Sequence, residues 1–192
     1  MLHKKYQIYL ASKSPRRKKL LKLLGIKFKS FSVDLNEEIL DGEHPILTVK
    51  RLAKQKLELA KTKVKSGIII TADTIVVLDT EIIGKPKNEK DAIVILKKLS
   101  GQTHSVYTGF AIENLDSKKM IVDYERTKVT FRKMSDDEIM NYIKSGSPMD
   151  KAGAYGIQDD YGAVFVSKIN GCYYNVVGLP LQKLFLAMQK VI

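Results

Sequence analysis

Residues 8–21, IYLASKSPRRKKLL, predict a strand, a tight turn and a helix in immediate succession. Ser14 is a favoured helix N-cap, and Pro15 suits the first helical position, where its missing N–H costs nothing. The free N–H groups of a helix N-terminus attract anions, and Arg16 and Arg17 in the first turn favour a phosphate. On its own, this stretch is explained equally well by an ordinary strand-to-helix turn with solvated basic residues.

The composition of the 192-residue chain is that of a soluble globular protein with one core, or with two small lobes sharing one. A formal net charge of +12 points to anionic partners such as nucleotides, nucleic acid or a membrane surface. The lysines are spread along the sequence, however, so a solvated basic surface is the alternative. Cys172 is the single cysteine, which excludes an internal disulfide and a cysteine metal cluster. The N-terminal apolar run is too short for a secretory signal and no segment has membrane-spanning length, so we expect a cytoplasmic protein.

Further along the chain, apolar residues alternate between helical and strand periodicity, without repeats or low-complexity linkers. This pattern predicts one compact α/β unit with a cleft between two lobes. We expect helices over residues 15–24, 45–65, 88–99 and 135–143 and after Pro180, strands over residues 26–33, 68–72, 103–112 and 120–131, and hairpins over residues 75–83 and 163–177.

Carboxylates follow two of the predicted strands, a single aspartate after one and an acidic run after the other. Asp73 comes directly after residues 68–72, whose β-branched side chains on both faces predict a central strand. Ligands of open α/β sheets gather at the carboxyl ends of strands, which makes Asp73 a functional candidate, and an aspartate that caps a turn is the alternative. The acidic run at residues 34–38 is more typical of a solvated turn than of a metal site.

Two loops have the composition of ordered segments. Lys85 lies between Gly84 and Pro86, which fix the path of the backbone on either side of it. Residues 146–162 are too rich in glycine for regular structure and too aromatic for a disordered linker. This segment, which contains Gln158, is therefore expected to pack as an ordered loop against a ligand or the core.

The sequence lacks the common phosphate-loop, dinucleotide-binding, zinc-protease and serine-hydrolase motifs. His3, His44 and His104 are isolated, which is more typical of surface or structural histidines than of catalytic ones. Basic residues and a few carboxylates on loops remain. Those groups suit a metal-assisted attack of water on a polyphosphate.

Six motifs together resemble the Maf family of nucleoside triphosphate pyrophosphatases, and they occur in family order across nearly the whole chain. A single motif would be weak evidence, whereas six in order are highly specific. The motifs are LASKSPRR (residues 10–17), ADTIV (72–76), GKP (84–86), LSGQTH (99–104), KAGAYGIQ (151–158) and NVVGLP (175–180).

The resemblance implies a single domain over residues 1–192, with a mixed twisted sheet, flanking helices and two lobes around a central cleft, as in inosine-triphosphate pyrophosphatases. It implies a cytoplasmic house-cleaning hydrolase that is often dimeric. Such an enzyme cleaves a nucleoside triphosphate between the α and β phosphates with a divalent cation, Mg²⁺ or Mn²⁺. The chain resembles the branch of the family that acts on dTTP and UTP rather than on 7-methyl-GTP. Modified pyrimidine nucleotides are further candidate substrates.

The resemblance also implies roles for individual residues. Asp73 matches the proton acceptor, and Glu37, or Glu38 beside it, matches a second carboxylate near the cation. The residues that match base-selecting positions are Arg16, Thr74 and Gln158, and those that match phosphate-binding positions are Ser12, Arg17, Lys56 and Lys85.

The chemistry of these side chains agrees with such roles. Asp73 can hold Mg²⁺, accept a proton from water, or do both, and Glu37 can supply a second carboxylate. Gln158 presents an acceptor beside a donor, which pairs with the N3–H and O4 of uracil or thymine. A carboxylate of Asp73 that proved buried and locked in an ion pair would argue against its catalytic role.

Two other hypotheses remain open at this point. The high positive charge and the family's link with septum formation suggest a regulatory protein that binds nucleic acid without turnover, although no recognition helix or aromatic platform is evident. A nucleotide-binding module without turnover is the third alternative.

Overall fold

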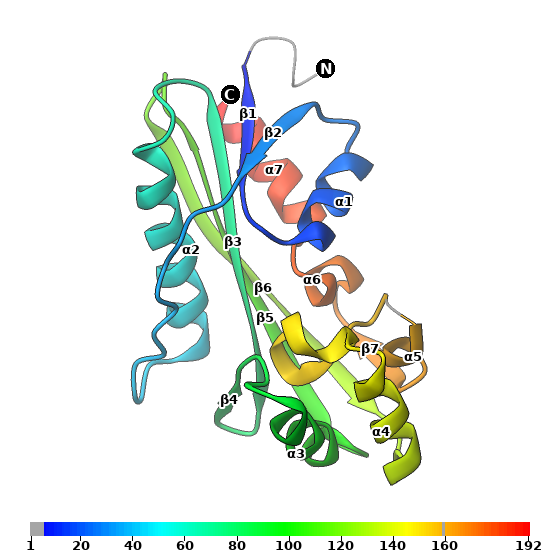
Figure 1. The fold of residues 1–192 in the computed structure, drawn as a ribbon. Helices are drawn as coiled ribbons and strands as arrows, with labels where there is room; N and C mark the ends of the chain where they lie inside the picture. Colours follow the sequence, from blue (N-terminus) through cyan, green and yellow to red (C-terminus); the bar gives the residue numbers. More distant parts are fainter. Residues whose placement is uncertain (1–5, 159) are drawn as a thin grey trace. The chain divides into compact units, whose positions relative to one another are not determined.

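The computed structural model describes residues 6–158 and 160–192, in which helices and strands are interspersed along the chain (Figure 1). The strands are β1 (Ile8–Ala11), β2 (Phe28–Phe31), β3 (Ile68–Leu78), β4 (Glu81–Ile83), β5 (Thr103–Asn114), β6 (Lys119–Phe131) and β7 (Val166–Asn170). The helices are α1 (Pro15–Leu23), α2 (Pro45–Lys61), α3 (Glu89–Leu99), α4 (Asp136–Lys144), α5 (Asp160–Ala163), α6 (Tyr173–Val177) and α7 (Leu181–Val191), with short 3-10 helices η1 (Ser147–Asp150) and η2 (Ala152–Ala154).

The strands form one seven-stranded sheet in the order β2-β1-β3-β5-β6-β7, with β4 paired to β3. β1 is parallel to both β2 and β3, whereas β3 with β4 and β6 with β7 are antiparallel. A mixed sheet with flanking helices confirms the predicted α/β class.

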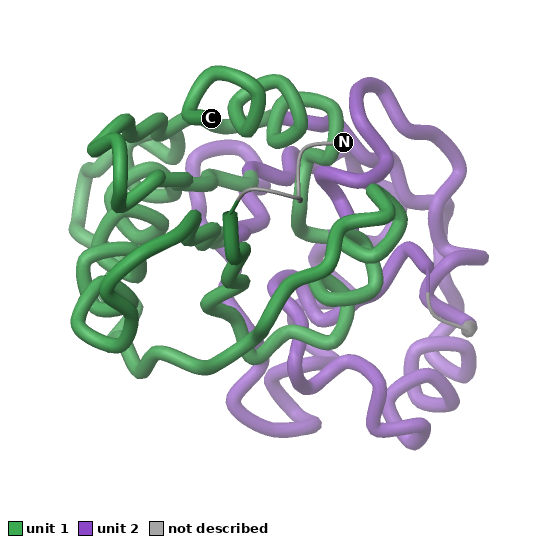
Figure 2. The backbone as a smooth tube through the Cα atoms, turned by 90° about the horizontal axis from the view of Figure 1, so that it is seen from above, with its two compact units in different colours: residues 1–73, 108–125, 178–192 green, residues 74–107, 126–177 purple. Residues whose placement is uncertain are grey.

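The chain divides into two compact units, which Figure 2 shows in different colours. Unit 1 contains residues 1–73, 108–125 and 178–192, and unit 2 contains residues 74–107 and 126–177. The division falls within β3, β5 and β6, so each of these strands contributes residues to both units.

In unit 1, helix α2 packs closely on the strands because small residues face it. A Cβ atom added to Gly109 of β5 would lie 2.3 Å from the carbonyl oxygen of Val49. On β3, the hydroxyl of Thr71 donates a hydrogen bond to the carbonyl oxygen of Ala53 at 2.7 Å. This packing determines which residues of α2 face β3. The buried cluster here comprises Ala11, Ala53, Leu57, Ala60, Ile69, Ala111 and Leu115.

Helix α1 begins as the sequence predicts. The hydroxyl of Ser14 accepts a hydrogen bond from the backbone N–H of Arg17 at 3.4 Å, and Pro15 is the first helical residue. Leu20 and Leu21 are buried, which anchors the helix. The first turn therefore presents Arg17 and its neighbour Arg16 at a capped helix N-terminus.

In unit 2, an aromatic cluster supports the glycine-rich segment. Phe131 of β6 lies edge-on to the rings of Tyr155 and His104, with ring centroids 4.7 and 4.9 Å away. Phe165 packs in the same way on Tyr142 of α4. Residues 146–158 of this segment turn through η1 and η2, with Gly153 at φ +71°, and pack against the core as predicted, whereas residue 159 lies outside the described residues.

The predicted break after residue 72 is wrong, because β3 runs without interruption from Ile68 to Leu78. Its first residues pair with β1 up to Ile70, and from Val76 onward it pairs with β4. Asp73 therefore lies inside a strand, between two sets of partners, rather than at the strand's carboxyl end.

The predicted hairpin over residues 163–177 is also wrong in its second half. β7 pairs with β6, but Tyr173–Val177 forms helix α6. Side-chain hydrogen bonds explain the change. Thr127 Oγ1 donates to the carbonyl oxygen of Cys172 and accepts from its N–H, both at 3.0 Å. Asn175 Nδ2 donates to Thr127 Oγ1 at 2.9 Å and to the carbonyl oxygen of Val106 at 3.0 Å.

We predict that His104 makes the protein acid-sensitive. The imidazole is 1% exposed, its Nε2 shares a hydrogen bond with the Tyr155 hydroxyl at 2.7 Å, and its Nδ1 has no partner among the described residues. Burial lowers the pKa of His104 from 6.5 to about 4. The unfolded chain therefore binds the extra proton first, and the free energy of unfolding falls as the pH drops from 6.5 to 4, by about 3 kcal/mol.

Urea unfolding in a pH series measures this effect. His104→Gln keeps a polar side chain that does not titrate, so its free energy of unfolding should fall less steeply over the same range. Parallel curves for the two proteins would show that the acid sensitivity has another source.

Candidate active site

A lysine lies between two carboxylates in unit 1. Lys56 Nζ donates to Asp73 Oδ1 at 2.5 Å and to Glu37 Oε1 at 2.6 Å. Lys56 and Asp73 are 8% and 4% exposed, whereas the side chain of Glu37 is 38% exposed. A buried charge is costly unless it is paired, so this cluster is held by mutual neutralisation.

The packing of α2 explains why Lys56 reaches Asp73. The buried face of α2 includes Val49, Leu52, Ala53 and Ala60, and Lys56 falls on the same stripe at helical spacing. A lysine on the buried face of a helix is unusual. That position is a sequence signal for a partner carboxylate.

Arg51 holds the loop that carries Glu37. Its Nε and Nη2 donate to the two carboxylate oxygens of Glu43 at 2.8 and 2.6 Å, and Nη2 also donates to the carbonyl oxygen of Glu38 at 3.0 Å. The guanidinium lowers the pKa of Glu43 below its ordinary value. Of the two candidates for the second carboxylate, Glu37 is the one whose side chain contacts Lys56. The role of Arg51 is not evident from the sequence, because nothing in its spacing separates it from the solvated basic residues of α2.

Arg17 brings a second cation toward the same carboxylates. Its Nε donates to the carbonyl oxygen of Gly178 at 2.8 Å. Desolvation lowers the pKa of Arg17, and the negative charges of Asp73 and Glu37 oppose that shift. The structure therefore places two cationic and two anionic side chains within electrostatic reach of one another.

The other predicted residues of unit 1 lie at the start of α1. Ser12 is buried, and its hydroxyl accepts a hydrogen bond from the N–H of Ser14 at 3.2 Å. Arg16 follows in the first turn and is half-buried. The backbone carbonyl of Gly178 is a contact that sequence reasoning did not find, because a main-chain acceptor has no residue-type signature.

Thr74, Lys85 and Gln158 belong to unit 2. The loop of Lys85 lies against the glycine-rich segment, since the carbonyl oxygen of Gly84 accepts from the N–H of Gly153 at 3.0 Å. Farther along that segment, the N–H of Gly156 donates to the Tyr142 hydroxyl at 3.1 Å. Two motifs that are far apart in the sequence thus meet within this unit.

The burial of Asp73 bears on its expected role. Its carboxylate is paired with Lys56, which is the arrangement that would argue against a catalytic base. Only Oδ1 is engaged, however. Oδ2 takes part in no hydrogen bond or ion pair with the residues that the structure describes.

The donor set is compatible with Mg²⁺ or Mn²⁺. The described residues contain no group of three or more histidine, cysteine, aspartate or glutamate side chains placed to hold a metal ion. Mg²⁺ bound together with phosphates needs only one or two protein carboxylates, and it takes its remaining ligands from substrate oxygens and water. Asp73 and Glu37, brought together by Lys56, fit that requirement.

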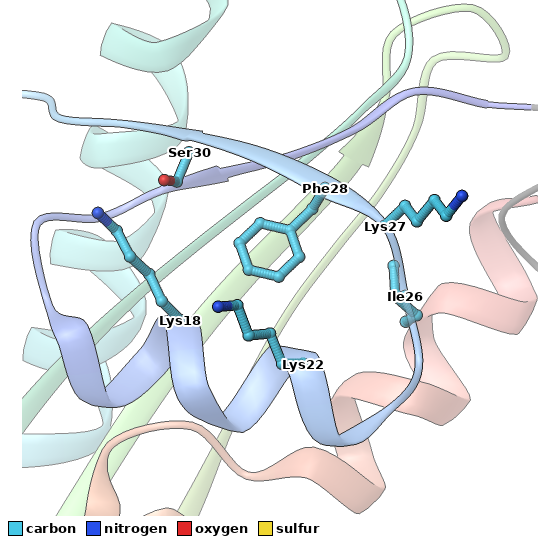
Figure 3. Close-up of a pocket in the computed structure, with 6 residues that line it drawn as sticks. All are labelled: Lys18, Lys22, Ile26, Lys27, Phe28 and Ser30. Atoms are coloured by element: carbon cyan, nitrogen blue, oxygen red, sulfur yellow. The ribbon is translucent and has the colours of Figure 1, made fainter.

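A separate open hollow of about 390 Å³ lies beside α1 and β2 in unit 1. Figure 3 shows Lys18 and Lys22 extending from α1 toward β2, with the Phe28 ring between the two elements and Lys27 pointing away. The residues that line it are Lys18, Lys22, Ile26, Lys27, Phe28 and Ser30, none of which was predicted as a site residue.

No helix in residues 6–158 or 160–192 has both the length and the apolar character needed to cross a membrane.

These observations define a mixed α/β protein in which carboxylates and cations meet near the N-terminus of a basic helix, an arrangement typical of sites for phosphorylated ligands. The sequence model of the family described as "Maf-like protein" matches residues 7–191. The chain belongs to the Maf family.

Relatives named "dTTP/UTP pyrophosphatase" are similar over almost the full length. The relative from Syntrophomonas wolfei is 48% identical over 176 residues, 92% of this chain and 93% of its own. That from Dictyoglomus thermophilum is 50% identical over 182 residues, covering 94% and 93%. That from Aquifex aeolicus is 46% identical over 185 residues, covering 96% and 95%.

Proposed function

We propose that this protein hydrolyses dTTP and UTP to the nucleoside monophosphate and pyrophosphate. The observation that carries the proposal is identity of 46–50% to pyrophosphatases of that name over more than nine-tenths of the chain. The Lys56 cluster supports it, because a polyphosphate reaction needs carboxylates and cations together, and Asp73, Glu37, Lys56 and Arg17 lie within electrostatic reach of one another. The comparisons give no support to a nucleic-acid-binding regulator without turnover.

In this proposal the triphosphate is held by charge and hydrogen bonds. It carries about four negative charges, and charge-assisted hydrogen bonds are the strongest that side chains make to phosphate. Arg17 is oriented for this task by the carbonyl oxygen of Gly178, which accepts a hydrogen bond from its Nε. The proposed phosphate-binding residues are Ser12, Arg17, Lys56 and Lys85.

Asp73 is the proposed proton acceptor. A water molecule forms a bond from its oxygen to phosphorus, the bridging P–O bond between the α and β phosphates breaks, and pyrophosphate leaves with the electron pair. The proton lost by the water passes to the Asp73 carboxylate. A divalent cation held by Asp73 and Glu37 would supply Lewis-acid stabilisation of the charge on the phosphate oxygens.

Arg16, Thr74 and Gln158 are the proposed base-selecting residues. The amide of Gln158 accepts from the N3–H of uracil or thymine and donates to O4, so the base finds both partners on one side chain. Gly156 and Ile157, which precede Gln158, are buried, and this supports a fixed position for the amide.

The proposal extends to the setting of the enzyme. We place it in the cytoplasm as a single domain over residues 1–192 that works with Mg²⁺ or Mn²⁺ as a homodimer. Resemblance to the family supports these points.

The first test is a pyrophosphate-release assay over dTTP, UTP, dCTP, dATP, GTP and 7-methyl-GTP with Mg²⁺ or Mn²⁺. We expect dTTP and UTP to have the highest kcat/KM, because uracil and thymine present N3–H and O4 to the amide of Gln158. Equal turnover of all nucleotides, or preference for 7-methyl-GTP, would contradict the proposed specificity.

Asp73→Asn should lower kcat for dTTP by a factor of about 100 or more, because the amide cannot accept the proton of the attacking water. Far-UV circular dichroism and urea unfolding check that the variant is folded. Asp79→Asn is the matched control, since Asp79 lies exposed in the turn between β3 and β4 and should keep full activity. If Asp73→Asn hydrolyses dTTP at the wild-type rate, Asp73 is not the base.

Gln158→Glu should change the base preference. A carboxylate cannot donate to O4, and an unpaired polar edge costs about 1–3 kcal/mol, so kcat/KM for dTTP should fall about 10- to 100-fold. It can accept from both N1–H and N2–H of guanine, so the ratio of GTP to dTTP turnover should rise. Gln182→Glu on the exposed face of α7 is the control. An unchanged ratio would show that Gln158 does not contact the base.

A further inference from the structure

The ammonium group of Lys56 lies where a metal ion would be expected. It contacts one oxygen of Asp73 and one of Glu37 at 2.5 and 2.6 Å, so a single cation bridges both carboxylates. These are the two carboxylates that would hold a divalent cation. No third carboxylate, histidine or cysteine joins them among the described residues to form a larger metal-binding group.

The ammonium and a divalent cation cannot share this position. Mg²⁺ binds carboxylate oxygens at about 2.1 Å, so an ion on the oxygens that Lys56 contacts would lie beside a positive charge that already neutralises them. A metal bound between the two oxygens that Lys56 contacts therefore requires Lys56 to leave. The four-carbon stem of lysine is flexible enough for that movement.

Lys56 needs a new acceptor once it leaves. It is buried, and a buried ammonium without a partner is strongly unfavourable. The anionic oxygens of a polyphosphate next to the carboxylates would provide that acceptor. The cost of moving Lys56 is thus high in the free protein and low when a polyphosphate is present.

We propose that Lys56 occupies the cation position in the free protein and that its transfer to the polyphosphate couples metal binding to substrate binding. This inference rests on the proposed function for the polyphosphate and for Asp73 and Glu37 as the ligands of the divalent cation. It makes Lys56 a competitor of the metal in one state and a ligand of the phosphates in the other. By linkage, each ligand increases the affinity for the other by the same factor.

The competition is tested with Mn²⁺ alone, by electron paramagnetic resonance of the free ion in titrations of the full chain. Lys56→Met removes the ammonium and keeps much of the side-chain volume, so Mn²⁺ should bind at least tenfold more tightly than to the wild type. Lys54→Met, on the exposed side of the same helix, should bind Mn²⁺ as the wild type does. Equal or weaker binding by Lys56→Met, including no binding at all, would overturn the proposal.

A second measurement uses the unaltered protein, in case Lys56→Met does not fold. The NH₃⁺ groups of buried lysines are followed by ¹H–¹⁵N correlation spectroscopy while Mg²⁺ and inorganic tripolyphosphate are added together. The Lys56 signal should move. The signal of Lys151, which is also buried and donates to Asp150 Oδ1 at 2.8 Å, should stay in place as an internal reference. A Lys56 signal that stays in place at saturation would overturn the proposal.

Neither measurement depends on turnover. Tighter Mn²⁺ binding by Lys56→Met in a protein that hydrolyses no nucleotide would refute the proposed function and leave the competition intact. If the wild type hydrolyses dTTP and Lys56→Met binds Mn²⁺ with the wild-type affinity, the proposed function stands and the competition is refuted.

Discussion

The ammonium group of Lys56 is held between Asp73 and Glu37 because the packing of α2 directs the buried Lys56 side chain toward Asp73. Gly109 allows the backbone of α2 to approach β5, and Thr71 ties β3 to the same helix. These contacts turn the stripe that bears Lys56 toward Asp73. The electrostatics of the site are therefore a consequence of close packing between a helix and a sheet.

The local features of the fold could be predicted because their causes are local. The cap at Ser14 forms where the sequence indicates it, and the side chains of Asn88 and Ser135 cap the helices predicted over residues 88–99 and 135–143. The continuity of β3 could not be predicted, because its first residues pair with β1 and its last residues pair with β4. The helix after Asn170 was missed for a similar reason, since it is held by hydrogen bonds to Thr127, more than 40 residues away.

The candidate site also has features that the sequence predicts and features that depend on distant parts of the chain. A run of motifs in order identified the residue types, and Asp73 and Arg17 stand out by their charge beside apolar segments. The partners of those residues did not stand out. The resemblance implies a phosphate contact for Lys56 and does not reveal its pairing with Asp73, and the Gly178 carbonyl has no side chain to recognise. Which charges neutralise one another is a property of three-dimensional packing.

The two kinds of ion pair near the site have different consequences. Arg51 binds Glu43 through two parallel hydrogen bonds, a geometry that fixes both groups and suits a loop that must stay in place. Lys56 offers a single ammonium on a flexible stem, and a point charge of this kind exchanges one set of oxygens for another without a geometric penalty. A buried aspartate paired with arginine would be locked, whereas one paired with lysine is released when a stronger polyanion arrives. The pairing of Asp73 with Lys56 is therefore consistent with a carboxylate that acts only in the presence of its substrate.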